Sequence, residues 1–269
     1  MGITICMINQ KGGCGKSSTC FHLAGAFAEL GQNVLLVDAD PQGSLSQGFF
    51  GSADIESLSA EETLAVAFDD QAPLFDPKML IRETPFERIS VVPANQHLAD
   101  YNVPRPETFG MRQFVLRELL DEFSSFDITL IDCPPNLYFC SWVAMVAADY
   151  AIIPVPPEDF GTQGLRAVHQ AIDNARVLNP TLRRLGHLVT RHDSRLLVHR
   201  SYEARLRVLY SQMVFDTVVP EASAFKVALA CRKPVGLYSS RSKAAQSTLC
   251  LAREILDKVA VRTAKRDVA

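Results

Sequence analysis

A short run of glycines, lysines and serines near the start of the chain has the composition of a phosphate-binding loop. The run reads Lys11-Gly12-Gly13-Cys14-Gly15-Lys16-Ser17-Ser18. A glycine-rich loop that leads into a helix binds phosphate through its backbone N–H groups and the helix N-terminus. In such a loop Lys16 would reach the β- and γ-phosphates, and the Ser17 hydroxyl would bind Mg²⁺. The run therefore predicts a site for a nucleoside triphosphate and magnesium.

Two further segments end in carboxylates that such a site could use. Asp38 and Asp40 follow the apolar run 33–37, and Asp132 ends the apolar run 126–131. In a parallel sheet the carboxyl ends of the strands meet at one edge, so these aspartates are expected near the phosphate loop. Asp132 would hold a Mg²⁺-bound water. The other interpretation is that these aspartates only cap turns.

Apolar runs and periodic apolar patterns predict the strands and helices that hold these residues. Strands are expected over 3–8, 33–38, 89–92, 126–132, 150–155, 185–190 and 214–220, and helices over 17–30, 111–123, 165–178 and 249–259. Strands that alternate with helices predict an α/β fold with a mostly parallel, doubly wound sheet flanked by helices. We expect residues 1–269 to form a single domain of this kind.

Charge is divided unevenly along the chain. Residues 1–175 hold 9 Lys and Arg against 23 Asp and Glu, whereas residues 176–269 hold 18 against 7. The two balances are therefore −14 and +11, within a formal net charge of −3. The basic portion, about 176–269, favours a surface for a polyanion such as nucleic acid. The alternative is that the two portions only neutralise one another.

The phosphate loop departs from the strict Walker A pattern, because Gln10 stands where that pattern needs glycine and Lys11 follows it. After it come D-x-D-P-Q-G at 38–43, V-P-A-N-x-x-L-A at 92–99 and I-D-C-P-P at 131–135. In this order the motifs resemble the ParA/MinD class of P-loop ATPases with a deviant Walker A motif, and in particular the ParA-type partition ATPases. The resemblance runs from about 3 to 259 and fits the short form without an N-terminal helix-turn-helix.

The resemblance implies a role for each matching residue. Lys11 would cross to the nucleotide of a partner subunit, Asp40 would position the attacking water or couple hydrolysis to the dimer, and Asp38 would lie close to Mg²⁺. Catalysis is thus assigned to Lys11, Lys16 and Asp40, and metal binding to Ser17, Asp38 and Asp132. The ATP-binding residues are expected to be Lys11, Gly12, Gly13, Cys14, Gly15, Lys16, Ser17, Ser18 and Pro220, the last packing on the adenine.

The same resemblance implies a function. ATP and Mg²⁺ would join two copies into a homodimer that binds double-stranded DNA without sequence preference. A ParB-like or other adaptor protein would stimulate an otherwise weak ATPase. The cycle would position a plasmid, a chromosome origin or a protein cluster on the nucleoid in the cytoplasm. The DNA contacts are expected to be Arg195, Arg232, Lys233, Arg241 and Lys243, although the family pattern is lost between 221 and 232.

Two other functions share the phosphate loop. A MinD-like positioning ATPase would cycle on a membrane and need an amphipathic anchor, but the residues after Val261 include few large apolar side chains. A metabolic P-loop enzyme would use ATP to activate a small carboxylate. That function gives no reason for Lys11 or for the basic portion.

Overall fold

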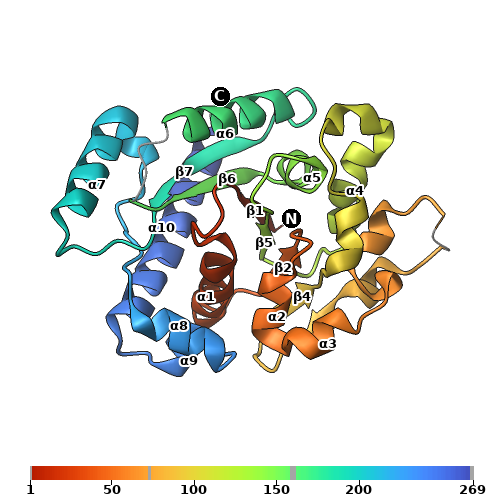
Figure 1. Ribbon diagram of the computed structural model, residues 1–269, viewed down its shortest axis with the longest axis horizontal. Helices are drawn as coiled ribbons and strands as arrows, with labels where there is room; N and C mark the ends of the chain where they lie inside the picture. The colour runs from red at the N-terminus through yellow and green to blue at the C-terminus, as the bar shows by residue number, and fades with distance from the viewer. Residues whose placement is uncertain (1, 72–73, 158–161, 267–269) are drawn as a thin grey trace.

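The computed structural model describes residues 2–71, 74–157 and 162–266. Its strands are β1 (Ile3–Met7), β2 (Val34–Asp38), β3 (Arg82–Glu83), β4 (Ile89–Val92), β5 (Ile128–Asp132), β6 (Tyr150–Val155) and β7 (Arg183–Val189). They form one sheet in the order β3-β4-β2-β5-β1-β6-β7 (Figure 1). Neighbouring strands are parallel except β3, which pairs antiparallel with β4. The predicted mostly parallel sheet is confirmed.

Helices cover both faces of the sheet. They are α1 (Lys16–Glu29), α2 (Ser44–Phe50), α3 (Ser52–Glu56), α4 (Val115–Asp121), α5 (Phe139–Ala147), α6 (Thr162–Ala175), α7 (Leu197–Tyr210), α8 (Ser223–Ala230), α9 (Val235–Tyr238) and α10 (Lys243–Arg266). On one face α1 and α10 bury Phe21 and Leu251 in a core shared with β1. On the other, α4, α5 and α6 contribute Leu116, Val143 and Ile172 to a second core. Because both faces are covered, the central strands are mostly apolar, with Thr4 in β1 and Thr129 in β5 as polar exceptions before the terminal Asp132.

The prediction of a strand over 214–220 is wrong. This segment runs beside β7 and forms isolated bridges only at Val214 and Pro220. Between them, the backbone N–H groups of Asp216 and Thr217 donate to the carboxylate of Glu254 on α10, each at 2.8 Å. Because a side chain takes these two donors, they are unavailable to a ladder with β7. The segment nevertheless carries Pro220 to the carboxyl edge of the sheet.

The helix predicted over 111–123 is also shorter than its apolar pattern. The α-helix begins at Val115, and a 3₁₀ helix over Pro106–Phe114 precedes it, interrupted at Gly110, where φ is 52°. The positive φ at Gly110 separates the first part of the 3₁₀ helix from residues 111–114, which wind as 3₁₀ helix up to the start of α4. The tail after Val261 lies partly outside the described residues. No helix among the described residues is both long and apolar enough to cross a membrane.

Candidate nucleotide-binding site

The phosphate loop connects β1 to α1 at the carboxyl edge of the sheet. Gly13 and Gly15 adopt positive φ angles of 69° and 91°, which a residue with a Cβ adopts only at a cost. Asn9 anchors the start of the loop, because its Nδ2 donates to the Pro154 carbonyl at 2.7 Å and its Oδ1 accepts from the Lys11 amide at 3.1 Å. The loop is therefore held in place before any nucleotide binds.

The two lysines of the loop lie differently. The buried Lys16 folds back over the loop, where its Nζ donates to the carbonyls of Asn9 at 3.0 Å and Lys11 at 3.3 Å. These bonds fix a positive charge beside the loop's backbone N–H groups, an arrangement that favours an anion. Lys11 is half-buried and, in the part of the chain that the structure describes, does not line the adjoining cavity.

Two carboxylates lie beneath the loop on adjacent strands. Asp38 ends β2 and pairs in register with Asp132, which ends β5, and both side chains are fully buried. Ser46 donates its amide and hydroxyl to Asp38 Oδ2 at 2.9 and 2.7 Å. Neither oxygen of Asp132 accepts a hydrogen bond from a described residue, although the Ser17 hydroxyl lies close by. Among the described residues, Asp132 is thus a buried carboxylate with the Ser17 hydroxyl nearby and no hydrogen bond to either oxygen.

Burial makes this cluster of carboxylates hard to ionise. It raises the pKa of Asp38 to about 7. Burial and the neighbouring Asp38 raise the pKa of Asp132 well above its ordinary value. Burial also raises the pKa of Asp40, against the opposing effects of the Gln42 amide and Lys16. A divalent cation would offset this repulsion, and hydroxyl and carboxylate oxygens are the ligands that Mg²⁺ prefers. The residues present therefore fit Mg²⁺.

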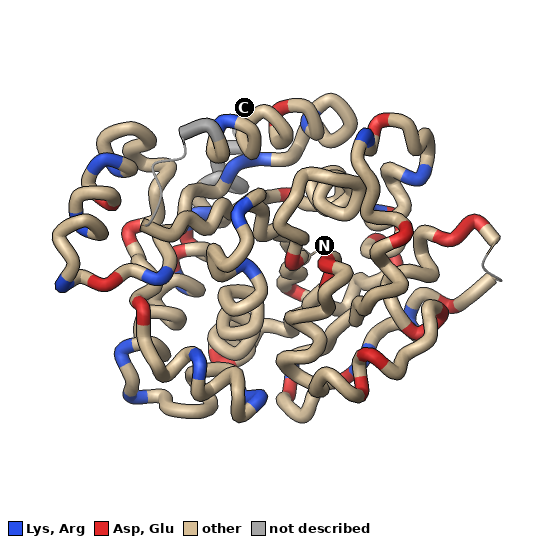
Figure 2. Tube along the Cα trace, in the orientation of Figure 1, with Lys and Arg blue, Asp and Glu red and all other residues tan. Residues whose placement is uncertain are grey.

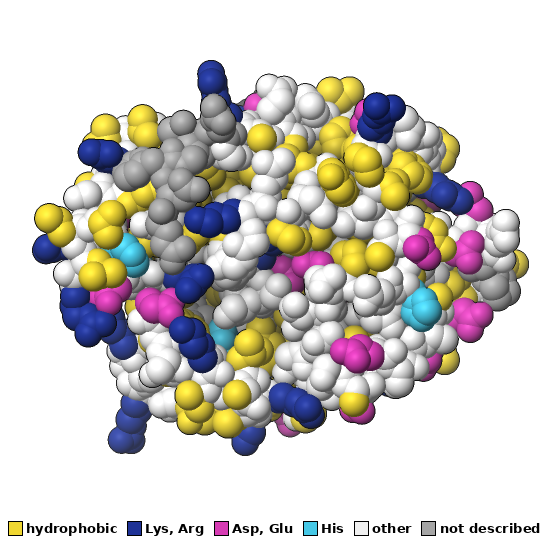
Figure 3. Space-filling view, viewed as in Figure 1, with side chains coloured by type: hydrophobic (Ala, Val, Ile, Leu, Met, Phe, Trp, Pro, Cys, Tyr) yellow, Lys and Arg dark blue, Asp and Glu magenta, His cyan; other side chains and the backbone are white. Residues whose placement is uncertain are grey.

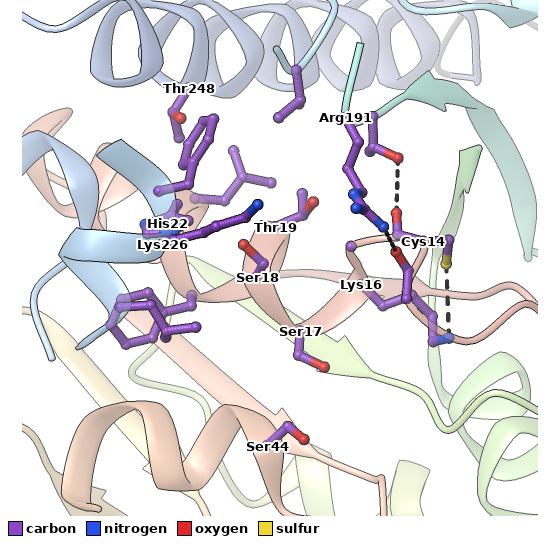
Figure 4. A pocket seen from close by; sticks show the side chains of 18 of the residues that line it. Cys14, Lys16, Ser17, Ser18, Thr19, His22, Ser44, Arg191, Lys226 and Thr248 are labelled. Atoms are coloured by element: carbon purple, nitrogen blue, oxygen red, sulfur yellow. Dashed lines mark hydrogen bonds between the residues drawn. The ribbon is translucent and has the colours of Figure 1, made fainter. Parts of the chain in front are cut away.

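A cavity of about 470 Å³ extends from the loop along α1 to the segments that follow β7. Its volume suits a small-molecule ligand. Seven predicted nucleotide-binding residues, 12–18, line it together with Asp40 and Pro220. Thr248, His22 and Lys226 lie across the cavity from Cys14 and Arg191 (Figure 4), and Phe225 and Leu251 also line the cavity. Thr190 also lines the cavity, and its hydroxyl donates a hydrogen bond to the carbonyl of Cys14 at 2.8 Å.

Three charged residues at the cavity were missed by the sequence analysis. Arg191 follows β7 and donates through Nη1 to the Gly13 carbonyl at 3.1 Å and through Nε to Glu221 at 3.2 Å. Lys226 on α8 donates to the other oxygen of Glu221 at 2.8 Å. Two of the three lie in 221–232, where the family pattern is lost. Sequence alone could not show which of the many cations in this portion faces the cavity.

The predicted DNA-binding residues lie outside the cavity. Arg195 is 88% exposed, and its guanidinium forms an ion pair with Asp193 at 2.7 Å. Lys233, Arg241 and Lys243 are exposed around α9, which packs against α8 and α10. Arg232 is exposed as well, and its guanidinium lies against Gly51, where a Cβ would come within 2.3 Å of Nη2.

The charges of the two portions are also separated in space. Lys and Arg gather along α7, α8 and α9, whereas Asp and Glu gather along the segment between α3 and α4 (Figure 2). On the face shown in Figure 3, most Lys and Arg side chains lie on the side of α7, α8 and α9 and most Asp and Glu side chains lie on the other side, with some of the opposite sign on each.

A glycine-rich loop before α1, aspartates at the ends of β2 and β5 and an adjoining cavity define a P-loop ATPase. A family model described as an AAA domain (AAA_31) matches residues 2–184. Over 271 residues the chain is 32% identical to the chromosome partitioning protein ParA of Myxococcus xanthus. The alignment covers all of this chain and 93% of that protein. It is also 32% identical to the sporulation initiation inhibitor protein Soj of Bacillus subtilis, covering 95% of this chain and 98% of that protein. The chain belongs to the ParA/Soj family of partition ATPases.

A solved structure that this chain resembles holds an ATP analogue and magnesium. The chain resembles cobyrinic acid a,c-diamide synthase from Mycobacterium smegmatis with bound ATP analogue and magnesium, at 27% identity and a TM-score of 0.78. The match covers 95% of each chain. The ATP analogue and magnesium bound in that structure agree with the ATP and Mg²⁺ that the sequence of this chain predicts.

Proposed function

We propose that this ATPase dimerises around two ATP molecules, binds DNA without reading its sequence, and positions a cargo, with an adaptor protein stimulating hydrolysis. The observation that supports this most is the contrast between the two loop lysines. Lys16 lines the cavity, whereas Lys11 begins the same loop but does not line the described cavity of its own subunit. A cation beside a phosphate site that it does not enter is suited to serve the site of a second copy.

Charge explains why ATP would control this association. Two triphosphates that face each other across an interface repel strongly, because each carries several negative charges. A Lys11 from each subunit, directed at the other's γ-phosphate, would turn that repulsion into attraction. ADP lacks the γ-phosphate, so the ADP form should separate.

Within each subunit the described residues have distinct tasks. Lys16 and the loop amides hold the phosphates, while Asp40, which lines the cavity, orients the attacking water. Ser17, Asp38 and Asp132 would hold Mg²⁺, which neutralises charge that develops on the β- and γ-phosphates. Hydrolysis removes the γ-phosphate, and the dimer then loses the interaction between Lys11 of one copy and the γ-phosphate bound by the other.

Dimerisation would also double the cationic surface around α8 and α9. Each DNA phosphate neutralised by Lys or Arg adds affinity that depends on salt and is independent of sequence. Two linked surfaces bind more tightly than one because the second contact becomes intramolecular. Arg195 would have to exchange its ion pair with Asp193 for a DNA phosphate.

A synthetase that activates a small carboxylate is the second candidate, because the solved structure described above is named a diamide synthase and holds an ATP analogue. The two functions differ in what they bind. A partition ATPase requires DNA and a second copy, whereas a synthetase requires a small organic acid. The 32% identity to partition proteins over nearly their full length favours the first.

Duplex binding tests the proposed function. We expect fluorescence anisotropy with unrelated 60-base-pair duplexes to show tight binding with ATP and weak binding with ADP. The double variant Lys233→Glu and Arg241→Glu should weaken ATP-dependent binding at least about tenfold and lower the salt slope by about two. Lys78→Glu, which reverses an exposed charge on the acidic side, should leave binding unchanged. Equal binding by the double variant and the wild type would contradict the assigned surface.

A further inference from the structure

Arg191 occupies a position that its backbone does not favour. Its φ is +54°, in the left-handed region, which a residue with a Cβ adopts less readily than glycine does. A strained residue of this kind persists only where its surroundings hold it, and such residues concentrate at functional sites. Here the surroundings are the Gly13 carbonyl and the Glu221 carboxylate, which both accept from the guanidinium.

The side chain is directed at the phosphate loop. In Figure 4 Arg191 points from the end of β7 toward the loop that carries Cys14 and Lys16. It lines the cavity between that loop and the far end, on the side opposite β5, where Asp132 lies. Its two hydrogen bonds use two of the five N–H donors of a guanidinium. The side chain is 43% exposed, so the remaining donors have room for a ligand.

We propose that Arg191 is a second cation for the nucleotide, contacting its α- and β-phosphates, and that Glu221 and Lys226 position it. The inference rests on the nucleotide-binding role of the cavity and adds a contact to it. A P-loop and its lysine cradle the β- and γ-phosphates. A guanidinium on the opposite side of the tail adds a planar, forked donor that matches phosphate oxygens.

The neighbours keep Arg191 in place without neutralising the cavity. Glu221 bonds Lys226 through one oxygen and Arg191 through the other. The hydrogen bond from Lys226, aided by Arg191, lowers the pKa of Glu221 against the effect of its partial burial, so this carboxylate stays ionised. The three side chains together carry one net positive charge. An incoming phosphate therefore meets a cation whose orientation is already fixed.

Titration with a fluorescent ADP, mant-ADP, tests the contact. Because a hydrogen bond to a charged group contributes about 1.5–3 kcal/mol, we expect Arg191→Gln to bind roughly 10- to 100-fold more weakly than wild type. Arg191→Lys keeps the charge but loses the forked donor, so its affinity should fall between those of wild type and Arg191→Gln. Glu221→Gln loses the positioning carboxylate but keeps Arg191, so it should bind more weakly than wild type, by a smaller factor than Arg191→Gln.

A glycine variant separates binding from folding. Arg191→Gly relieves the left-handed strain, so its melting temperature should not fall, while its affinity for mant-ADP should fall as in Arg191→Gln. Arg88 offers a matched control, because it also has a positive φ of 65° and donates to a glycine carbonyl, that of Gly31, at 3.3 Å. It lies at the opposite edge of the sheet, and Arg88→Gln should bind as wild type does.

Two results would overturn the inference. One is wild-type affinity in Arg191→Gln. The other is an equal loss in Glu221→Gln and Arg191→Gln with a lowered melting temperature in both, which would make Arg191 only a link between the loop and Glu221. Failure of the wild type itself to bind mant-ADP would instead contradict nucleotide binding, which is a separate result.

Discussion

At the scale of single residues, three carboxylates beneath one loop must divide their tasks. Asp38 and Asp132 are fully buried side by side, whereas Asp40 lines the cavity. One Asp40 oxygen accepts from the Gln42 amide at 3.0 Å, which fixes the orientation of the carboxylate. A fixed carboxylate at the cavity wall can orient a water for attack, while the buried pair is suited to a metal ion.

Asp40 therefore provides a test at this scale. We expect Asp40→Ala to bind mant-ATP within about threefold of wild type but to hydrolyse ATP about 100-fold more slowly, since a positioned general base contributes about 10²–10⁴-fold. Phosphate release under saturating ATP and Mg²⁺ measures the rate. Asp54→Ala, which changes an exposed carboxylate outside the cavity, is the control. Unchanged turnover in Asp40→Ala would remove this residue from the catalytic set.

At the scale of elements, the sequence was most informative where strands are buried on both faces. β1, β2, β5 and β6 show as continuous apolar runs, and their ends placed the phosphate loop and the aspartates correctly. The segment 214–220 has a similar apolar pattern, yet a carboxylate from α10, far along the chain, takes two of its amides. A contact between residues so distant in sequence leaves no local signal. The position of Arg191 at the cavity could not be predicted for the same reason, because its contact with Gly13 joins residues far apart in the sequence.

Another element-scale feature is a histidine pair between α6 and β7. His187 Nε2 lies 2.9 Å from His169 Nε2, and its Nδ1 lies 3.1 Å from the Met213 carbonyl. A carbonyl only accepts, so His187 Nδ1 donates and its Nε2 accepts from His169. The ring also stacks on Tyr210 at 4.1 Å between centroids. A neutral His187, protonated at Nδ1, satisfies both contacts.

The pair predicts a loss of stability in acid. Burial, reinforced by His169, lowers the pKa of His187 to about 4 from 6.5. Between these values the unfolded chain binds the proton that the folded chain refuses, so stability falls as pH falls from 6.5 to 4, by up to about 3 kcal/mol for this group. Denaturant unfolding should show a smaller loss over this range in His187→Gln than in wild type. His97→Gln, at an exposed position, should follow wild type, and equal slopes in all three proteins would contradict the assignment.

At the scale of the whole molecule, one edge of the sheet connects the nucleotide to the cationic surface. The cavity is walled by α1 on one side and by the segments around α8 and α10 on the other. Lys226 on α8 reaches the cavity, while Lys233 and Arg241, which follow it in sequence, are exposed. A nucleotide that joins two copies at this edge would bring two such surfaces together. ATP binding would thereby control DNA binding.

Sedimentation velocity with ATP or ADP tests this claim most directly, using Asp40→Ala to prevent turnover. The account predicts that Asp40→Ala sediments as a dimer with ATP and Mg²⁺ and as a monomer with ADP. Adding Lys11→Ala should leave a monomer in both, even though mant-ATP still binds. A dimer that persists without Lys11, or a monomer with saturating ATP, would contradict the account.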